Sequence, residues 1–262
     1  MMHPLILSAS RGFSGGAAAA AWTPASATPL FWADAAAAFG SGLFQDSGKT
    51  SLVTTALQAV GAWVQEGAIT PDLLQSGALT KGYFTSLSSG ALAVGFDGVD
   101  DRLASAQTFT AGAKTLAFRF QYSTALGATE LDTPLSLGDA TGQVRILLAG
   151  ASHATYPRLS WAFDLTGASA LFLGSNDLTV NTSEHTVVIA YNGGTRTDPA
   201  SYRVWVDGVE GTVTTRGSTT AFGTTSLGAG STGAAPATIK YARIALLQGD
   251  QSAIVSSILT WL

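Results

Sequence analysis

The clearest pattern of apolar and polar positions lies at residues 183–213. Residues 185–191 form an almost continuous apolar run that is rich in β-branched side chains, which predicts a strand. Residues 202–206 alternate between the two faces of a second strand. Asp207-Gly208 follows between apolar flanks and predicts a tight hairpin into a third strand, because glycine tolerates a positive φ. The link 192–199 consists of turn residues, so the region is predicted to form part of an antiparallel sheet.

Short strands are predicted along much of the remaining chain, at a spacing of roughly ten residues that is typical of sandwiches and barrels. Residues 115–122 alternate most regularly and carry Leu, Phe, Phe and Tyr on one face. The other predicted strands are residues 91–96, 134–138, 144–149, 159–163, 170–173 and 238–248. Asp250 then caps a short helix with an apolar stripe that runs to Leu262. The pattern predicts an all-β fold, an antiparallel β-sandwich with a short C-terminal helix.

The N-terminal third has a different composition. Residues 1–28 are biased toward Ala, Gly, Ser and Pro, which predicts an extended N-terminal arm held by another subunit or, alternatively, along its own sandwich. Residues 29–89 form a lead-in segment that packs on the sandwich or on a partner. Within it, residues 56–59 allow a short helix, and residues 71–89 are a Gly/Ser-punctuated connector. Residues 90–262 are the predicted sandwich domain.

Composition narrows the classes of function. Of the 262 residues, 46% are hydrophobic and only 11% are charged, against roughly 25% in ordinary soluble domains. A surface so poor in charge is expected to be partly covered by neighbours. The net charge of −4 and the scattered basic residues give no electrostatic basis for a nucleic-acid partner. We expect neither a signal peptide nor a membrane helix, since no apolar stretch approaches roughly 20 residues.

Candidate catalytic and metal-binding groups are few. The absence of cysteine excludes disulfides and thiolate metal sites. Glu130 and Asp132 are the only candidates for the paired carboxylates of a glycosidase, but a third acid is missing and Pro134 interrupts the strand. A polar loop is the favoured interpretation of that stretch. The three histidines, His3, His153 and His185, are not spaced for a metal, and His185 is expected to pack in a strand.

Two further patterns leave alternatives open. The acidic residues Asp97, Asp100 and Asp101 favour a turn, in which their side chains bond nearby backbone N–H groups, over a calcium site. Sugar binding would need aromatic platforms and polar groups at loop tips. Tyr156, Trp161, Trp205 and Asn192 are the candidates, although aromatic residues on sandwich strands are more often core. Trp205 shares a face with Arg203, which predicts a partly exposed aromatic side chain. We therefore assign no catalytic, cofactor, metal or ligand residue.

Several motifs resemble known families. Three of them resemble a pattern in virion proteins of tailed bacteriophages, where it precedes a laminin-G-like domain: Phe31-Trp32-Ala33-Asp34, Leu43-Phe44-Gln45-Asp46-Ser47 and Val60-Gly61-Ala62-Trp63. The stretches 96–101 and 202–208, together with the strand–helix ending, resemble laminin-G-like and concanavalin A-like jelly-roll domains. Residues 56–59 of this chain are Ala-Leu-Gln-Ala. They depart from the phage pattern, which prefers polar turn residues at these positions.

The resemblance implies a non-enzymatic structural or adhesive protein located in a phage-like virion. Capsid decoration, a head fibre, and a tail or baseplate component are the candidate positions. The expected partners are other virion proteins bound through the arm, further copies in a homo-oligomer, and a host-surface glycan as a candidate ligand. The alternatives are a carbohydrate-binding module of a bacterial surface protein and, third, a degenerate glycoside hydrolase. Fold alone does not choose among them.

Overall fold

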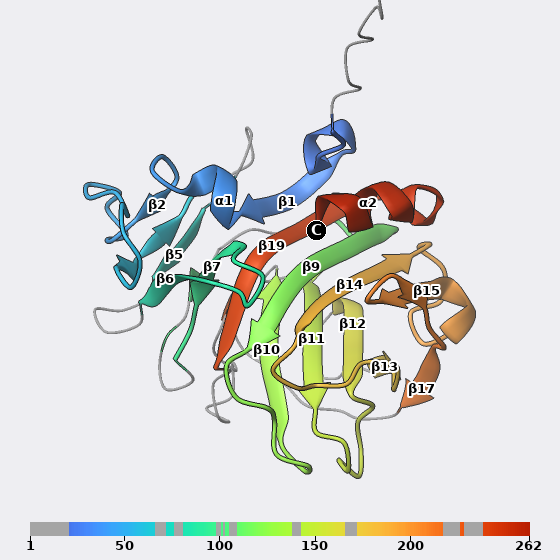
Figure 1. Cartoon of the computed structure of the whole chain (residues 1–262). Coiled ribbons are helices and arrows are strands. Elements are labelled where there is room, and N and C mark those ends of the chain that lie inside the picture. Colours follow the sequence, from blue (N-terminus) through green and yellow to red (C-terminus); the bar gives the residue numbers. More distant parts are fainter. Residues whose placement is uncertain are drawn as a thin grey trace, which may run out of the picture.

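The computed structural model describes residues 21–65, 72–75, 81–97, 101, 103–104, 109–137, 143–165, 172–216, 226–227 and 238–262. Within these residues the chain forms two large antiparallel sheets, with short helices at their margin (Figure 1). The inward-facing side chains of both sheets meet in one continuous apolar core. The predicted all-β antiparallel sandwich with a short C-terminal helix is therefore confirmed.

Sheet A contains nine strands among the described residues. They are β1 (Pro29–Asp34), β3 (Ala59–Val60), β6 (Gly82–Ser86), β7 (Leu92–Gly95), β9 (Lys114–Tyr122), β14 (Glu184–Tyr191), β15 (Tyr202–Val206), β16 (Val209–Glu210) and β19 (Ile239–Gln248). Their order is β16-β15-β14-β9-β19-β7-β6-β3, and β1 also pairs with β19.

Sheet B contains ten strands in the same described part of the chain. They are β2 (Leu43–Phe44), β4 (Ala62–Trp63), β5 (Leu73–Gln75), β8 (Leu103–Ala104), β10 (Leu131–Leu137), β11 (Gln143–Ala149), β12 (Leu159–Leu165), β13 (Phe172–Ser175), β17 (Thr214–Arg216) and β18 (Ser226–Leu227). Their order is β17-β13-β12-β11-β10-β18-β8-β5-β4-β2. The helical elements are η1 (Pro24–Ser26), α1 (Ala35–Ala38), η2 (Pro199–Ser201), η3 (Ser252–Ile254) and α2 (Val255–Trp261).

The strands predicted from alternation lie at the centre of sheet A. β14 pairs with β9 over its whole length and with β15 on its other edge. The hairpin after β15 has Asp207 at φ 50° and Gly208 at φ 82°, the positive values expected for this turn. The Leu, Phe and Tyr face of β9 points into the core between the sheets, as the period-two pattern predicts.

The last strand, β19, joins the two ends of the described chain. One edge of β19 pairs with β9, while its other edge is shared by β7 and by β1. In Figure 1 the blue β1 accordingly lies against the red β19. Asp34, at the end of β1, caps α1 by accepting the Ala36 N–H at 2.9 Å and also accepts from Nε of Arg243 at 2.8 Å. The lead-in is therefore bonded to the closing strand.

A second, smaller apolar cluster covers the outer face of sheet A. There α2, whose last residue is Trp261, packs with Trp205 and with the rings of Trp22 and Trp32. Trp205 is only 7% exposed, and the guanidinium of Arg203 lies 4.7 Å from the centre of its ring. The prediction of a partly exposed Trp205 is therefore wrong. Alternation assigns a residue to a face of the sheet, but it does not show that a distant helix covers that face.

The lead-in segment supplies strands to both sheets. β1, β3 and β6 belong to sheet A, and β2, β4 and β5 belong to sheet B. The predicted connector at residues 71–89 thus contains two strands, which are short enough to resemble punctuated loop sequence. Residues 1–20 of the predicted arm lie outside the described residues.

The helix allowed by the sequence at residues 56–59 is absent from this described segment. Leu57 has φ 64°, and the Gln58 side chain accepts the N–H groups of Thr54 and Thr55 at 2.7 and 3.1 Å. These bonds form a turn instead. The helix of this region is α1, which Asp34 caps.

The contacts of Glu184, at the start of β14, predict how the free energy of unfolding depends on pH. Its carboxylate accepts from Arg119 Nη2 at 2.6 Å, from the Ser88 hydroxyl at 3.0 Å, and from the Ser89 N–H. Burial raises the pKa of Glu184, but the hydrogen bonds from Arg119, Ser89 and Ser88 outweigh it and lower the pKa from 4.5 to about 2. A carboxyl group whose pKa is lowered by folding stabilises the folded protein at pH values above its unfolded pKa. This stabilisation is lost as the pH falls through the folded pKa.

We therefore expect Glu184→Gln to lower the free energy of unfolding by about 1.5–3 kcal/mol at pH 7. This difference from the unaltered protein should shrink as pH falls from 4.5 toward 2, as measured by urea unfolding at several pH values. Glu210→Gln is the control, because Glu210 forms an exposed pair with Arg203 and should cost less than about 1 kcal/mol. A Glu184→Gln deficit that does not change with pH would contradict the assignment.

Candidate functional site

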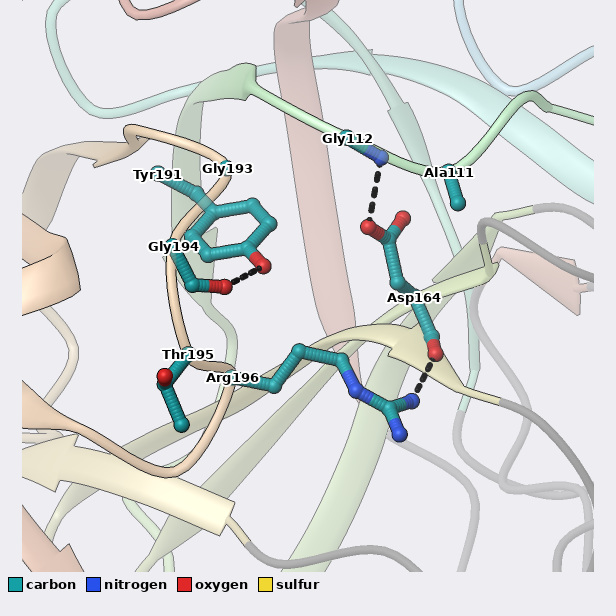
Figure 2. Close-up of a pocket in the computed structure, with 8 residues that line it drawn as sticks. All are labelled: Ala111, Gly112, Asp164, Tyr191, Gly193, Gly194, Thr195 and Arg196. Atoms are coloured by element: carbon teal, nitrogen blue, oxygen red, sulfur yellow. Dashed lines mark hydrogen bonds between the residues drawn. The ribbon is translucent and has the colours of Figure 1, made fainter.

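A hollow of about 580 Å³ opens at one end of the sandwich, where strands of both sheets end or begin. Figure 2 shows its lining: Ala111, Gly112, Asp164, Tyr191, Gly193, Gly194, Thr195 and Arg196. Ala111 and Gly112 precede β9, Tyr191 ends β14, and the residues from Gly193 to Arg196 belong to the link between β14 and β15. Asp164 comes from β12 in the opposite sheet. The hollow is therefore built across the two sheets.

A β-bulge in β12 positions Asp164. Val144 of β11 pairs with Phe163, whereas Gln143 pairs with Leu165, so Asp164 is the extra residue. Its φ of 53° lies in the left-handed region, which aspartate tolerates better than most residues. A bulge redirects the side chain of the extra residue. Here it brings a carboxylate, 5% exposed at the residue level, to the segment that precedes β9.

Asp164 forms a buried ion pair with Lys114, the first residue of β9. The Lys114 ammonium donates to Oδ1 of Asp164, and only 1% of the lysine side chain is exposed. Oδ2 of Asp164 accepts the Gly112 N–H at 2.7 Å, and the ammonium also donates to the Gly112 carbonyl at 3.1 Å. Buried charges are tolerated when they are paired and hydrogen-bonded in this way. The pair ties sheet A to sheet B, and Asp164 itself lines the hollow.

The β14–β15 link is held in place by hydrogen bonds. Tyr191 Oη donates to the Gly194 carbonyl at 2.6 Å, and Tyr202 Oη donates to the Arg196 carbonyl at 3.2 Å. The two tyrosine rings stack with centroids 4.7 Å apart. Arg196 in turn donates from Nη1 to the Asp164 carbonyl, as the lower dashed line in Figure 2 shows. The arginine therefore connects the link to the bulge across the hollow.

The tyrosine hydroxyls of this site act as neutral groups near pH 7. Burial raises the pKa of Tyr191, Asp164 raises it further, and Arg196 acts in the opposite direction. Burial also raises the pKa of Tyr202, with further contributions from Tyr191 and Asp164. Both phenols remain hydrogen-bond donors, which is the role that their contacts with the link require.

Of the candidates for sugar binding, the aromatic ones are buried. Trp161 lies fully in the main core, Tyr156 packs on the outer face of sheet B, and Trp205 lies under α2. The interpretation of these aromatic residues as packing residues is confirmed. Asn192 lies next to the hollow, but its side-chain oxygen accepts the Gly194 N–H at 2.8 Å. Its contribution is thus to the shape of the link.

Glu130 and Asp132 do not form a facing pair of carboxylates. Glu130 is exposed and accepts the Gly127 N–H at 2.7 Å, while Asp132 is 3% exposed and accepts from the Tyr122 hydroxyl at 2.8 Å. Asp132 lies within β10 rather than in a loop, and the strand passes Pro134 through a register shift. The proline therefore distorts the strand without ending it.

Two of the histidines and two residues of the acidic trio lie in the described ranges and have local structural contacts. His185 is buried and lies 2.8 Å from Asp207 and 3.1 Å from Asn181, so the packing role predicted for it is confirmed. His153 Nδ1 accepts two backbone N–H groups in a turn. Asp101 accepts the Asp97 N–H at 2.9 Å, as the predicted turn requires, whereas Asp100 and His3 lie outside the described residues. Within the described ranges no three His, Cys, Asp or Glu residues gather as a metal site.

The hollow was not predicted from the sequence, although two features of the sequence point to it. A lysine stands directly before the most regular strand, and an aspartate interrupts the apolar stretch Trp161-Ala162-Phe163-Asp164-Leu165. A charged residue inside an apolar strand marks a bulge or a buried partner. The glycines at 193 and 194 had been assigned to a turn, which is correct but incomplete.

Comparisons with known proteins do not identify a family. No family model and no curated protein matches the chain. One similar solved structure is the sialidase of Trypanosoma rangeli, at 14% identity and a TM-score of 0.35. The match covers 86% of this chain and 36% of the sialidase chain, and at this TM-score it supports no conclusion about fold or activity. No helix within the described ranges has the length and apolarity to span a membrane.

The buried Lys114–Asp164 pair leads to a second prediction, which concerns stability. Lys114→Met should lower the free energy of unfolding by about 3–5 kcal/mol, because it leaves the Asp164 carboxylate buried without its cation. Adding Asp164→Asn should recover a large part of this loss. Urea unfolding of the single and double variants measures the coupling.

Lys49→Met is the matched control, since Lys49 forms an exposed pair with Asp72 and should cost less than about 1 kcal/mol. Equal stability of the Lys114 single and double variants would show that the pair does not carry this energy.

Proposed function

We propose that this protein is a non-enzymatic structural or adhesive component of a phage-like virion. Its position would be in capsid decoration, a head fibre, or a tail or baseplate. The laminin-G-like resemblance and the phage-like pattern at residues 30–66 motivate the proposal. The sandwich would serve as a rigid module, with residues 1–28 as the arm that binds neighbouring proteins of the particle.

The observation that supports this proposal most is the attachment of residues 22–34 to the sandwich. Trp22 and Trp32 contact Trp261 of α2, with ring centroids 6.3 and 6.2 Å apart. β1 continues this contact by pairing with β19. An arm that begins before Trp22 would therefore have a fixed base on the outer face of sheet A. Binding of the arm to a particle would then also hold the sandwich on that particle, as an anchored particle protein requires.

The contacts in the hollow favour holding a ligand over breaking a bond. Both carboxylate oxygens of Asp164 are bonded, one to Lys114 and one to the Gly112 N–H. A general base or acid must instead reach the proton that it transfers. These charged groups are committed to the shape of the hollow, which supports a binding role.

Exposed apolar side chains support contacts with neighbours. Leu57 is 77% exposed and Val209 is 70% exposed, on a chain with few charges. Leu57 also has a positive φ, an uncommon conformation for a bulky residue. We include further copies of the chain among the proposed partners.

A carbohydrate-binding module of a bacterial surface protein is the second candidate function. The hollow favours it, because a concave site with a few convergent polar groups is typical of small-ligand binding. A virion adhesin that binds a glycan would have the same hollow. Location of the protein therefore separates the two functions better than ligand binding does.

Particle association provides the test. Immunolabelled particles from a host that encodes this chain should carry it in electron micrographs, and it should sediment with them through a density gradient. Replacing residues 1–20 with a Gly-Ser sequence of equal length should reduce incorporation by about tenfold or more, which corresponds to ~1.4 kcal/mol of binding. The control is Arg196→Gln, which alters the hollow and should be incorporated normally. Absence of the unaltered chain from particles would refute the virion function.

A further inference from the structure

Arg196 carries a positive charge that has no acidic partner among the described residues. It donates from Nη1 to the backbone carbonyl of Asp164, and its remaining N–H groups have no bond within the part of the chain that the structure describes. Three other arginines pair with carboxylates: Arg119 donates to Glu184, Arg203 to Glu210, and Arg243 to Asp34. Toward the described residues, this guanidinium at the edge of the hollow therefore keeps donors for a ligand.

The other charges of the hollow leave this positive charge in place. Lys114 and Asp164 neutralise each other as a buried pair. The described lining therefore has a net charge of about +1 from Arg196, which is exposed at the edge of the hollow. An anionic group is favoured there. The planar fork of the guanidinium matches a carboxylate, which accepts two parallel N–H bonds.

The remaining lining suits a hydroxylated ring. Thr195 offers a hydroxyl, and the Gly194 carbonyl has a second lone pair beside the bond from Tyr191 (Figure 2). The Tyr191 ring is only 2% exposed and stacks on Tyr202, so it serves as structure behind the hollow and not as a platform. The phenol oxygen of Tyr191 can still accept a hydrogen bond. The volume of about 580 Å³ falls within the roughly 300–1,000 Å³ of small-molecule sites.

We propose that this hollow binds an acidic sugar residue, a hexuronate within a glycan. The carboxylate pairs with Arg196, while the sugar hydroxyls bond to Thr195, to the Gly194 carbonyl and to the phenol oxygen of Tyr191. The site requires no movement of the Lys114–Asp164 pair. This inference goes beyond a virion function, because it depends on the hollow alone.

Calorimetric titration of the full-length chain with a trigalacturonate is the direct test. The fully methyl-esterified trisaccharide has the same ring structure without the charge, and we expect it to bind at least about tenfold more weakly, as the loss of a charge-assisted pair implies. Acetate is the probe for a simple anion site and should not compete at equal concentration. Equal affinity for acid and ester, or full competition by acetate, would overturn the proposal.

Variants assign the binding to the hollow. Arg196→Gln should weaken trigalacturonate binding by about tenfold or more, and Arg196→Lys should fall between it and the unaltered protein, because lysine keeps the charge and loses the fork. Arg158→Gln is the matched control, since the Arg158 side chain bonds to the Asn176 carbonyl and is not part of the lining. The thermal unfolding midpoints of all variants establish that they are folded.

Unchanged affinity in Arg196→Gln, or an equal loss in Arg158→Gln, would refute the site. Neither result depends on whether the chain is found on a particle. Conversely, absence from particles would leave the sugar titration unaffected, so the two proposals fail separately.

Discussion

The pairing of β19 along both of its edges is the constraint on which the rest of the structure depends. β9 occupies one edge, and the other edge is divided between β7 and β1. The last strand of the chain therefore completes a sheet that the first described strand also requires. The bond from Arg243 to Asp34 adds a side-chain connection at the point where α1 begins. Because these contacts span most of the chain length, sheet A can close only after the C-terminal part is available.

The Lys114–Asp164 pair has the corresponding role between the sheets. Packing of two apolar faces leaves their relative position loosely defined, since many apolar contacts of similar energy exist. A buried pair with fixed hydrogen bonds is more selective, because a shifted arrangement would leave charges without partners. The bulge at Asp164 and the backbone of Gly112 meet this requirement at one end of the sandwich. The hollow follows from that junction, and Arg196 on the adjoining link adds a positive charge to it.

Period-two patterns made the central strands predictable, and contacts between distant residues made the site unpredictable. β9 and β15 were apparent from their alternation, and β14 from an almost continuous apolar run that is mostly buried. Trp205 was misjudged because α2, some fifty residues later, covers the outer face that alternation assigns to solvent. Lys114 and Asp164 are also separated by 50 positions, and no local pattern indicates which charge meets which. The short strands β5 and β6 carry too few residues for a period to appear.

The base of the arm and the hollow are physically connected. The Gly249 N–H donates to the Ala113 carbonyl at 2.8 Å, and the Gln248 N–H donates to the Thr28 carbonyl at the same distance. Ala113 follows Gly112 of the hollow, and Thr28 precedes β1, so the end of β19 lies between the two features. The Trp22–Trp32–Trp261 contacts, in contrast, lie over the outer face of sheet A. Trp22 therefore lies on the outer face of sheet A, whereas residues of both sheets and of the β14–β15 link line the hollow. The two features do not overlap, as the proposed adhesive particle protein would require in order to bind a neighbour and a ligand together.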